Sequence, residues 1–403
     1  MKYSIAVICM LFFSVNVCGQ EQNLKARRRS LRPDTTMVQH QPAEEQTESP
    51  QRSDRKPSES KEKPGLRRVN MEDAATQFQM ANRFAKGDRF VAKNDSMAVD
   101  LWTKSARQGY ALAMHKLGEC YRYGYNGLPQ DDKQAVYWWR KTLEQDRDTG
   151  APMRKRELTA LSTTVREVFL CTRFDLGNCY AFGFGVTEDD SMAIRLFREA
   201  AVTPEYQFRL GEKFYFGDGI HPSNSQALEW YTRSAEGGYR DAMYNVGNMY
   251  YEGRGTAKDP SKAVEWWKRA SDAGDTMSAY NVACCYASGI GVAQNLKKAN
   301  EWYEQSALLN NVKAQLALGY AYYHGTNGHK KSLRKARKWF ELAARNGDAE
   351  AQYCMGILYY YGESVDANKR EATRWFMKSA RQGYEQSIGA LQELGVKVRI
   401  EYE

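Results

Sequence analysis

The chain has 403 residues, of which 42% are hydrophobic, 27% charged and 12% aromatic, and its formal net charge is +9. Its 26 Tyr, 15 Phe and 9 Trp can bury a large apolar area, which excludes a wholly disordered chain. Glycine follows no triplet period and only 8 cysteines are spread along the sequence, so collagen and disulfide-dense miniproteins are excluded. A mean hydropathy of −0.70 argues against a polytopic membrane protein.

The first 19 residues have the pattern of a secretory signal peptide. Lys2 precedes an apolar stretch from Ile5 to Val17, which is too short for a membrane anchor. Val17-Cys18-Gly19 provides small residues for cleavage before Gln20. We therefore predict a signal peptide over residues 1–19 and a bacterial protein exported to the periplasm or the exterior. The alternatives are a lipoprotein anchored at Cys18, for which Val17 is not the small preceding residue required, and a chain that is not processed.

Residues 20–70 contain no Tyr, Phe, Trp or Cys but hold five of the ten prolines. Such a segment cannot bury enough apolar surface to offset its chain entropy, so we predict a disordered linker. It carries 12 Lys/Arg against 8 Asp/Glu, and the run Arg27-Arg28-Arg29 is interpreted as solvated rather than bound to acidic lipid or polymer. From Met71 onward, 45 Lys/Arg nearly balance 41 Asp/Glu, which gives no support to nucleic-acid binding.

The remainder of the chain is one unit copied many times. The copies align on Leu-Gly-x-x-Tyr, and a second glycine follows six residues after the first. Later copies continue with Ala-x-x-Trp and a second aromatic residue, and these tryptophans are 36 or 37 residues apart. The first glycine stands at positions 118, 177, 211, 247, 319 and 356, with Ala283 in one copy, and the tryptophans are Trp230, Trp266, Trp302, Trp339 and Trp375.

Each copy has the pattern of two helices. In helix A the apolar residues recur at helical spacing until the second glycine ends the helix. In the following loop, Asp259 can cap the next helix while Pro260 occupies its first turn. Helix B then carries an apolar stripe such as Ala263, Trp266 and Ala270. The first glycine, having no side chain, lets helix A approach a neighbouring helix closely.

These motifs resemble the Sel-one-like repeats (SLR), relatives of the tetratricopeptide repeats, from about Ala74 to Ile388. The resemblance implies an all-α fold, a right-handed α/α superhelical solenoid of seven to eight helix-turn-helix repeats, and a role as an adaptor or scaffold for other proteins. Repeats 1–2 are expected over 71–145, repeats 3–8 over 172–388 and a C-terminal cap over 389–403. The first copy, from Phe78 to Gly109, is degenerate because its helix A lacks Leu-Gly-x-x-Tyr.

One interval departs from the period. Gly118 and Gly177 are 59 residues apart, and the excess over one period falls within 146–171. Leu161, Val165 and Val168 recur at helical spacing there, which predicts an inserted or elongated helix.

The resemblance to tetratricopeptide solenoids also implies a ligand surface. In that family helix A lines a concave groove, and the positions three before, one after and four after its glycine face the groove. Tyrosines there would offer rigid contact area with a hydrogen-bonding tip, or they would cover the seam between neighbouring A helices. The tyrosine three after the glycine recurs in nearly every copy and is interpreted as core. The groove candidates are Phe208, Tyr215, Tyr244, Asn248, Tyr251, Tyr280, Tyr320, Tyr323, Tyr353 and Tyr360.

Six cysteines follow the signal segment, at positions 120, 171, 179, 284, 285 and 354. An even number in an exported chain permits three disulfides, and a cysteine-rich branch of the family bridges helix A to helix B. Here helix B offers no partner, and Cys171 and Cys179 would be about 12 Å apart along one helix. We therefore interpret the cysteines as small buried residues.

Catalytic motifs are weak. The five histidines show no metal-ligand spacing with Cys, Asp or Glu, so neither a metal nor another cofactor is predicted. Ser53, Ser58 and Ser332 each begin a Ser-x-x-Lys sequence, as in serine β-lactamases, but the companion motifs are missing. Some cysteine-rich relatives have been described as β-lactamase-like, so a cell-wall-linked hydrolase is the enzymatic alternative.

The sequence thus favours a non-catalytic, exported repeat scaffold that binds a partner protein or peptide, such as an envelope complex, in a concave aromatic groove. Binding of a cell-wall polymer is the other alternative. Neither a nucleic-acid partner nor, after signal cleavage, a membrane-spanning segment is expected.

Overall fold

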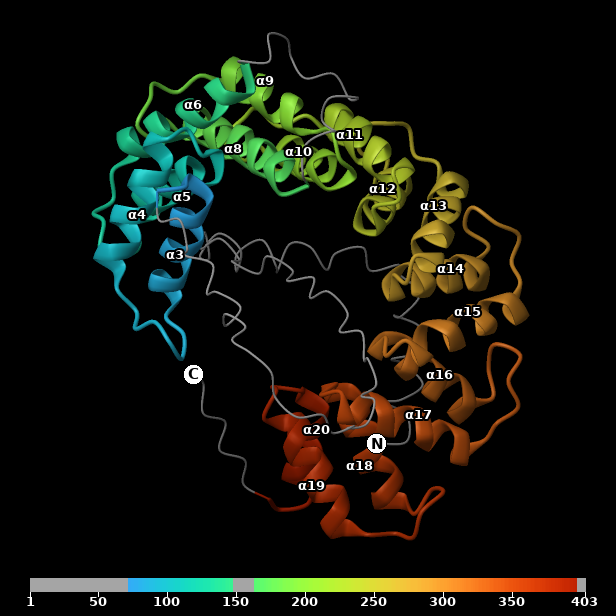
Figure 1. Ribbon diagram of the computed structural model, residues 1–403. Helices are drawn as coiled ribbons and strands as arrows, with labels where there is room; N and C mark the ends of the chain where they lie inside the picture. The colour runs from blue at the N-terminus through green and yellow to red at the C-terminus, as the bar shows by residue number, and fades with distance from the viewer. Residues whose placement is uncertain (1–71, 148–162, 397–403) are drawn as a thin grey trace, which may run out of the picture. The chain divides into compact units, whose positions relative to one another are not determined.

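A computed structural model describes residues 72–147 and 163–396 (Figure 1). The predicted signal peptide, the predicted linker and the first part of the predicted insertion lie outside these residues. The described residues form 17 helices and no strand. They divide into two compact units, one ending at Asp131 and one beginning at Asp132, and each unit is described by itself.

The helices alternate between A helices, which hold the Leu-Gly-x-x-Tyr position, and B helices, which hold the Ala-x-x-Trp position. The smaller unit contains the A helices α3 (Ala74–Lys86) and α5 (Ala111–Tyr123) and the B helix α4 (Asp95–Arg107). In the larger unit the A helices are α8 (Thr163–Phe182), α10 (Pro204–Phe216), α12 (Arg240–Glu252), α14 (Thr276–Ser288), α16 (Val312–His324), α18 (Ala349–Tyr361) and α20 (Glu385–Glu393). Its B helices are α6 (Asp132–Arg147), α9 (Asp190–Ala200), α11 (Asn224–Glu236), α13 (Pro260–Asp272), α15 (Leu296–Leu308), α17 (Leu333–Arg345) and α19 (Lys369–Ala380).

Packing follows the order of the chain. In the larger unit each A helix from α8 to α18 packs most extensively against the B helix that follows it, as α10 does against α11, and each B helix packs against the next A helix. In the smaller unit α4 packs against both α3 and α5. In the larger unit the A helices form one layer and the B helices another (Figure 1). Contacts limited to neighbours along the chain define a solenoid, in which no hairpin can shield its own apolar face. The predicted all-α solenoid is therefore confirmed.

Local sequence explains where the helices begin and end. Six A helices end at a glycine in the left-handed conformation, such as Gly253 with φ of 77°. The Asp259 carboxylate accepts the Lys262 N–H at 3.0 Å and caps α13, whose first residue is Pro260. The Asp259 N–H donates to the Tyr250 carbonyl at 2.8 Å, and the equivalent bond recurs in the other repeats. One backbone bond thus fixes the angle between helix A and helix B.

The first glycine of the motif meets helix B of its own repeat. A Cβ atom built on Gly247 would lie 2.5 Å from the Trp267 indole, and one on Gly211 would lie 2.6 Å from the Tyr231 ring. No real Cβ tolerates such contacts, so the absence of a side chain allows the ring to lie on the helix backbone. The predicted close approach is confirmed, and its partner is the second aromatic residue of the Trp-aromatic pair.

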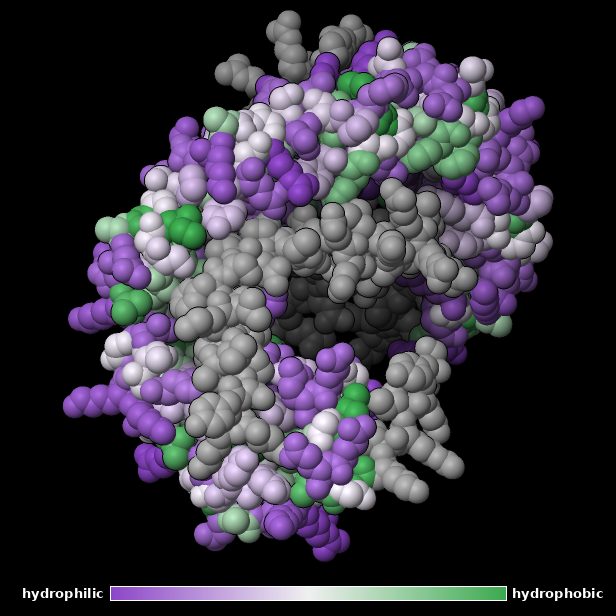
Figure 2. All heavy atoms as spheres, turned by 180° about the vertical axis from the view of Figure 1, so that it is seen from behind, coloured by the Kyte–Doolittle hydropathy of each residue, from purple (hydrophilic) through white to green (hydrophobic). Residues whose placement is uncertain are grey.

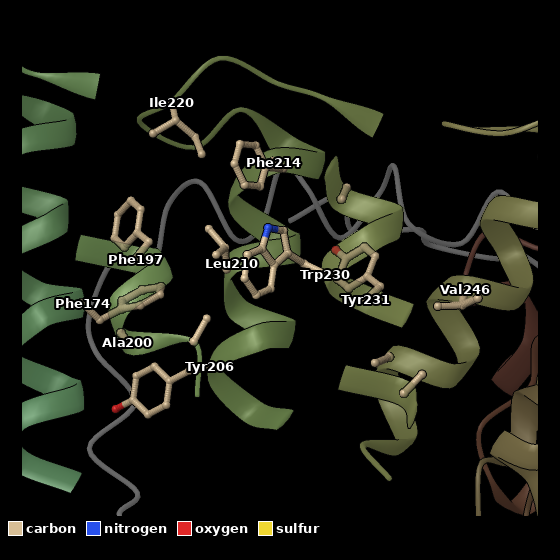
Figure 3. Close-up of a cluster of buried hydrophobic side chains, with 14 of the residues drawn as sticks. Phe174, Phe197, Ala200, Tyr206, Leu210, Phe214, Ile220, Trp230, Tyr231 and Val246 are labelled. Carbon is tan, nitrogen blue, oxygen red and sulfur yellow. The ribbon is translucent and has the colours of Figure 1, made fainter. Parts of the chain in front are cut away.

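That second aromatic residue is the centre of each repeat's core. Trp267, Phe340 and Phe376 are almost fully buried, whereas the preceding tryptophans Trp266 and Trp339 are only half-buried. In the early repeats the core is one continuous cluster, in which rings from α8, α9, α10 and α11 interleave (Figure 3). The labelled members are Phe174, Phe197, Ala200, Tyr206, Leu210, Phe214, Ile220, Trp230, Tyr231 and Val246.

The tyrosine three after the glycine is less uniform than a core position would be. Phe214, Tyr286 and Tyr322 are buried, while Tyr121, Tyr180, Tyr250 and Tyr359 are half-buried. A basic side chain of helix B covers several of these rings: Lys262 lies over Tyr250 at 5.3 Å and Lys335 over Tyr322 at 4.9 Å. The position is therefore a packing site whose ring is covered by a lysine ammonium group.

Two helices depart from the regular repeat, α8 within the array and α20 at its C-terminal end. Helix α8 has 20 residues where α10 has 13, and it runs through the boundary predicted at residues 171–172. Val165, Val168 and Phe169 belong to this long helix, while Leu158 and Leu161 lie outside the described residues. Helix α20 occupies the place of a ninth A helix, so the boundary predicted at residues 388–389 falls inside it.

Candidate functional site

The ten predicted groove residues lie on five consecutive A helices of the larger unit, α10 to α18. We call this set the A face; it comprises Phe208, Tyr215, Tyr244, Asn248, Tyr251, Tyr280, Tyr320, Tyr323, Tyr353 and Tyr360. Its members differ in how much surface they leave accessible, and this difference separates packing residues from candidate ligand contacts.

Two members of the A face are buried. The exposed fraction of Asn248 is 7%, and its Oδ1 accepts the indole N–H of Trp267 at 3.1 Å. Tyr353 is 3% exposed and packs between the rings of Phe376 and Tyr384. Both side chains are occupied by packing, and little of their surface is left for a ligand.

The other eight members are half-buried, and several bridge one repeat to the next. The Tyr320 hydroxyl donates to Glu350 Oε1 at 2.7 Å, and the Tyr323 hydroxyl donates to Glu363 Oε2 at 2.6 Å. Arg254 donates to the Tyr215 hydroxyl at 2.5 Å. These tyrosines cover the seam between A helices, as one of the two sequence interpretations expected.

Tyr251 and Tyr360 make fewer contacts within the protein than the tyrosines that bridge two repeats. The Tyr251 ring contacts Trp267 with centroids 5.4 Å apart, and the Tyr360 ring contacts Tyr361 at 5.0 Å. Among the described residues neither hydroxyl has a hydrogen-bond partner. Each therefore keeps a hydrogen-bonding tip available for an incoming group.

The A face has no acid–base chemistry near neutral pH. Burial raises the pKa of Tyr353 to about 12 and that of Tyr320 well above its usual range. The tyrosines are therefore neutral aromatic surfaces with hydroxyl groups, which suits them to contact rather than proton transfer.

The cysteines are free and largely buried. Burial raises the pKa of Cys285 to about 12 and that of Cys171 to about 11, because a thiolate would lose its solvation. Protonated thiols are poor nucleophiles and poor metal ligands. The sequence interpretation of the cysteines as small buried residues agrees with five of the six positions, and Cys171 is half-buried.

The Ser-x-x-Lys sequence in the described part of the chain is a helix cap. Ser332 Oγ accepts the Lys335 N–H at 3.4 Å at the start of α17, as the equivalent capping residues do in other B helices. Ser53 and Ser58 lie outside the described residues. Within 72–147 and 163–396, no group of three His, Cys, Asp or Glu side chains could hold a metal ion.

Two recurring contacts escaped the sequence interpretation. A third glycine packs on the first turn of the preceding B helix: a Cβ on Gly291 would lie 2.5 Å from the Pro260 carbonyl. A buried serine of helix B ties it to the start of helix A, as Ser306 Oγ donates to the Thr276 carbonyl at 2.7 Å. Both had a signal in the sequence, namely the Gly-x-Gly pairs and the Ser-Ala pair that follows Trp230, Trp302 and Trp375. A motif does not, however, say which backbone its residues contact.

No helix in the described part of the chain has the length and apolar character needed to cross a bilayer.

Comparison with known proteins places this geometry in a family. The Sel1 repeat family model matches residues 74–110, 111–146, 173–201, 204–239, 240–275, 276–311, 312–348 and 349–384. The two ranges 111–146 and 173–201 leave the start of α8 unmatched, which is where the repeat period is broken.

Two curated proteins are similar over part of the chain. "Chitin synthase regulatory factor 3" of Schizosaccharomyces pombe is 26% identical over 42% of this chain and 16% of its own length. "Exopolysaccharide production negative regulator" of Rhizobium leguminosarum bv. viciae is 29% identical over 36% of this chain and 52% of its own length. The chain thus spans about half of one relative and about a sixth of the other.

Solved structures share the fold. The c5321 antigen of uropathogenic Escherichia coli, described as displaying an SLR fold, is 29% identical with a TM-score of 0.55, covering 80% of this chain and 64% of that one. A Sel1 repeat protein from Oxalobacter formigenes, 24% identical, has a TM-score of 0.61 and covers 81% and 88% of the two chains, and it supports the fold alone. The eight matched segments cover well over half of the chain, which belongs to the Sel1 repeat family.

Proposed function

We propose that this protein is a non-catalytic, exported scaffold that holds a partner protein or peptide on its A face. The observation that carries the proposal is the row of eight half-buried aromatic side chains on consecutive A helices, whose positions vary from repeat to repeat. Repeat packing needs the same residue in every copy, whereas recognition needs different residues in a fixed frame.

The contacts on the A face favour a polypeptide ligand. Aromatic rings give rigid contact area at low entropic cost, and the Tyr251 and Tyr360 hydroxyls can pair with a backbone or side-chain group. Arg254 and Glu363, which bond the neighbouring Tyr215 and Tyr323, add charged groups of both signs along the same surface. A polypeptide offers both apolar and polar groups to such a surface.

The names of the curated relatives support a regulatory role. Both describe regulators of polysaccharide production, one of chitin synthase and one of exopolysaccharide. A Sel1 array that regulates an enzyme must contact it or one of its partners. We therefore propose that the partner is a protein of the cell envelope, in keeping with the signal-like pattern from Lys2 to Gly19.

A crosslinked pull-down from envelope extract tests the proposal. The variant Tyr251→Ala with Tyr360→Ala removes two rings whose hydroxyls have no partner among the described residues, so the fold should be preserved, as circular dichroism would check. We expect recovery of the partner to fall at least about tenfold, as loss of two aromatic contacts commonly produces. Tyr137→Ala, which truncates an exposed tyrosine on helix α6, is the matched control and should leave recovery unchanged.

Equal recovery by the A-face variant and the wild type would remove the A face as the binding surface. Recovery of cell-wall polymer in place of protein would assign the surface to the polymer instead.

A further inference from the structure

We propose that the starts of the last three B helices form a cationic edge that docks on an anionic lipid surface. The edge lies on α15, α17 and α19 and on the loop before α17, and none of its residues is a member of the A face. All its side chains are exposed, and they are Lys297, Lys330, Arg334, Lys335, Lys369 and Arg370. The proposal is independent of the partner-binding function assigned to the A face.

The first observation is a change of charge along the array. The first turns of the early B helices contain acidic residues: Asp95 in α4, Asp132 in α6 and Asp190 in α9. Those of α11, α13, α15 and α17 contain none. In the last three B helices the second position is basic, with Lys297 in α15, Arg334 in α17 and Arg370 in α19, where Glu371 follows. The N-terminal end of a helix carries partial positive charge, so acidic residues are stabilising there and basic residues are not. Helix stability therefore does not explain the lysines and arginines of the late repeats.

The second observation is that five of these cations have no ion pair with another described residue. In the described part of the chain no carboxylate lies within 4.0 Å of the Lys297, Lys330, Arg334, Lys369 or Arg370 head groups, as the recorded ion pairs show. Elsewhere the same kind of side chain is paired, as Lys262 with Asp259 at 3.6 Å in α13. An unpaired cluster has its full charge available to an external anion.

The third observation is that the cations lie on consecutive repeats, and that a hydrogen bond joins the first two of them. Asn300 of α15 donates to the Asn327 carbonyl at 2.6 Å, which seats the loop before α17 against the first turns of α15. The ring of His329, in the same loop, lies on Tyr322 with centroids 4.2 Å apart. In Figure 1, α15, α17 and α19 follow one another on the B layer of the larger unit. The cations therefore lie at corresponding places of three successive repeats, and we call this set the row.

The apolar residues within the row favour a lipid surface over a soluble polyanion. Leu296, 37% exposed, and Leu333, half-buried, open α15 and α17 directly beside Lys297 and Arg334. Leucines next to lysines can enter the boundary between headgroups and acyl chains while the cations meet the phosphates. The row contains none of the exposed aromatic rings on which the bases of a single-stranded nucleic acid would stack. Figure 2 shows one face of the molecule, on which hydrophilic residues predominate and hydrophobic residues are scattered among them.

Sedimentation of the full chain with lipid vesicles tests the proposal. We expect binding to vesicles of phosphatidylcholine with phosphatidylglycerol and none to phosphatidylcholine alone. The variant Lys297→Glu, Arg334→Glu and Arg370→Glu should bind at least about tenfold more weakly, because each basic residue near an anionic membrane contributes to affinity. Raising the salt concentration should weaken wild-type binding as the charges are screened.

Two controls sharpen the result. Lys133→Glu, Arg198→Glu and Arg233→Glu reverse the same number of exposed charges on earlier B helices and should bind like the wild type. Arg27→Ser, Arg28→Ser and Arg29→Ser remove the basic run near the N-terminus. The proposal would be overturned if this N-terminal variant lost vesicle binding while the variant of the edge bound vesicles like the wild type.

Soluble dextran sulfate separates the two classes of polyanion. Leu296→Ser should weaken binding to vesicles and leave binding to dextran sulfate unchanged. A wild type that binds dextran sulfate but no anionic vesicle would assign the edge to an acidic polymer and overturn the lipid assignment. The Tyr251→Ala and Tyr360→Ala variant should bind vesicles like the wild type. Vesicle binding therefore tests the edge alone, and partner recovery tests the A face alone.

Discussion

The contact between helix A and helix B within a repeat differs in kind from the seam between successive A helices. Within a repeat, a glycine receives the flat face of an aromatic ring, as Gly247 receives Trp267 and Gly356 receives Phe376. The seam is polar and changes from repeat to repeat: Cys171 meets the Tyr206 hydroxyl at 2.8 Å, whereas Tyr320 meets Glu350.

This difference shows how the array separates stability from recognition. The contact inside each repeat depends on shape, so it keeps a small residue on helix A and an aromatic ring on helix B, and its removal should be costly. The seam uses hydrogen bonds of modest net value, so its residues can change without loss of the fold. A surface that evolves to recognise a partner is best placed on the seam.

Removal of a ring from the centre of a repeat should have the largest effect. Phe340→Ala should lower the free energy of unfolding by about 4 kcal/mol, because a fully buried ring leaves a cavity beside Gly319. Trp339→Ala, at the half-buried neighbour, should cost about half as much. Urea denaturation measures both changes, and a larger loss for the tryptophan would reverse the assignment of the core residue.

Addition of one methyl group at the glycine position should have the next largest effect. Gly247→Ala should lower the free energy of unfolding by about 2 kcal/mol, since its Cβ would overlap the Trp267 indole. Gly389→Ala in α20, where a Cβ meets nothing within 4 Å, is the matched control and should be neutral or stabilising by up to about 1 kcal/mol. If both variants unfold at the same urea concentration, shape does not govern the contact.

Removal of a hydroxyl from the seam should have a smaller effect. Tyr323→Phe keeps the ring and loses the bond to Glu363, which should cost about 1 kcal/mol. The same urea experiment applies. If Tyr323→Phe lowered the free energy of unfolding as much as Phe340→Ala does, the seam and the core would contribute equally to stability.

A charge in the seam should produce the smallest change, and one that depends on pH. Burial raises the pKa of Glu350 above its ordinary value of 4.5, the hydrogen bond from Tyr320 lowers it, and Asp348 raises it. The folded state then binds the proton more tightly than the unfolded state, so ionisation of Glu350 costs stability at neutral pH. Below the unfolded pKa both states are protonated and the cost is absent.

Glu350→Gln should therefore be slightly more stable than the wild type at pH 7, with the advantage shrinking as the pH falls toward 4.5. Thermal unfolding followed across that range is the measurement. An advantage that stays constant with pH would exclude ionisation of Glu350 as its cause.

The repeats, the helix ends and the fold class could be predicted from the sequence because their causes are local. Gly253 ends α12 and Asp259 with Pro260 begins α13 through contacts within a few residues. The period of the tryptophans is equally visible in the sequence, and periodicity implies stacking.

The candidate site could be predicted only in part. The sequence located the A face by analogy, but it could not separate the buried Asn248 and Tyr353 from the more accessible Tyr251 and Tyr360. That distinction depends on rings contributed by the B helix of the same repeat and by the start of the next A helix, such as Trp267 and Tyr384.

The sequence by itself determined a series of helical hairpins, because each turn, cap and apolar stripe is set by neighbours along the chain. Only the tertiary structure decided which ring packs on each glycine and which tyrosines cover the seam between A helices. The physical reason is that these contacts join residues some 20 to 40 positions apart, as from Gly247 to Trp267 or from Tyr323 to Glu363, whose meeting depends on how the hairpins stack.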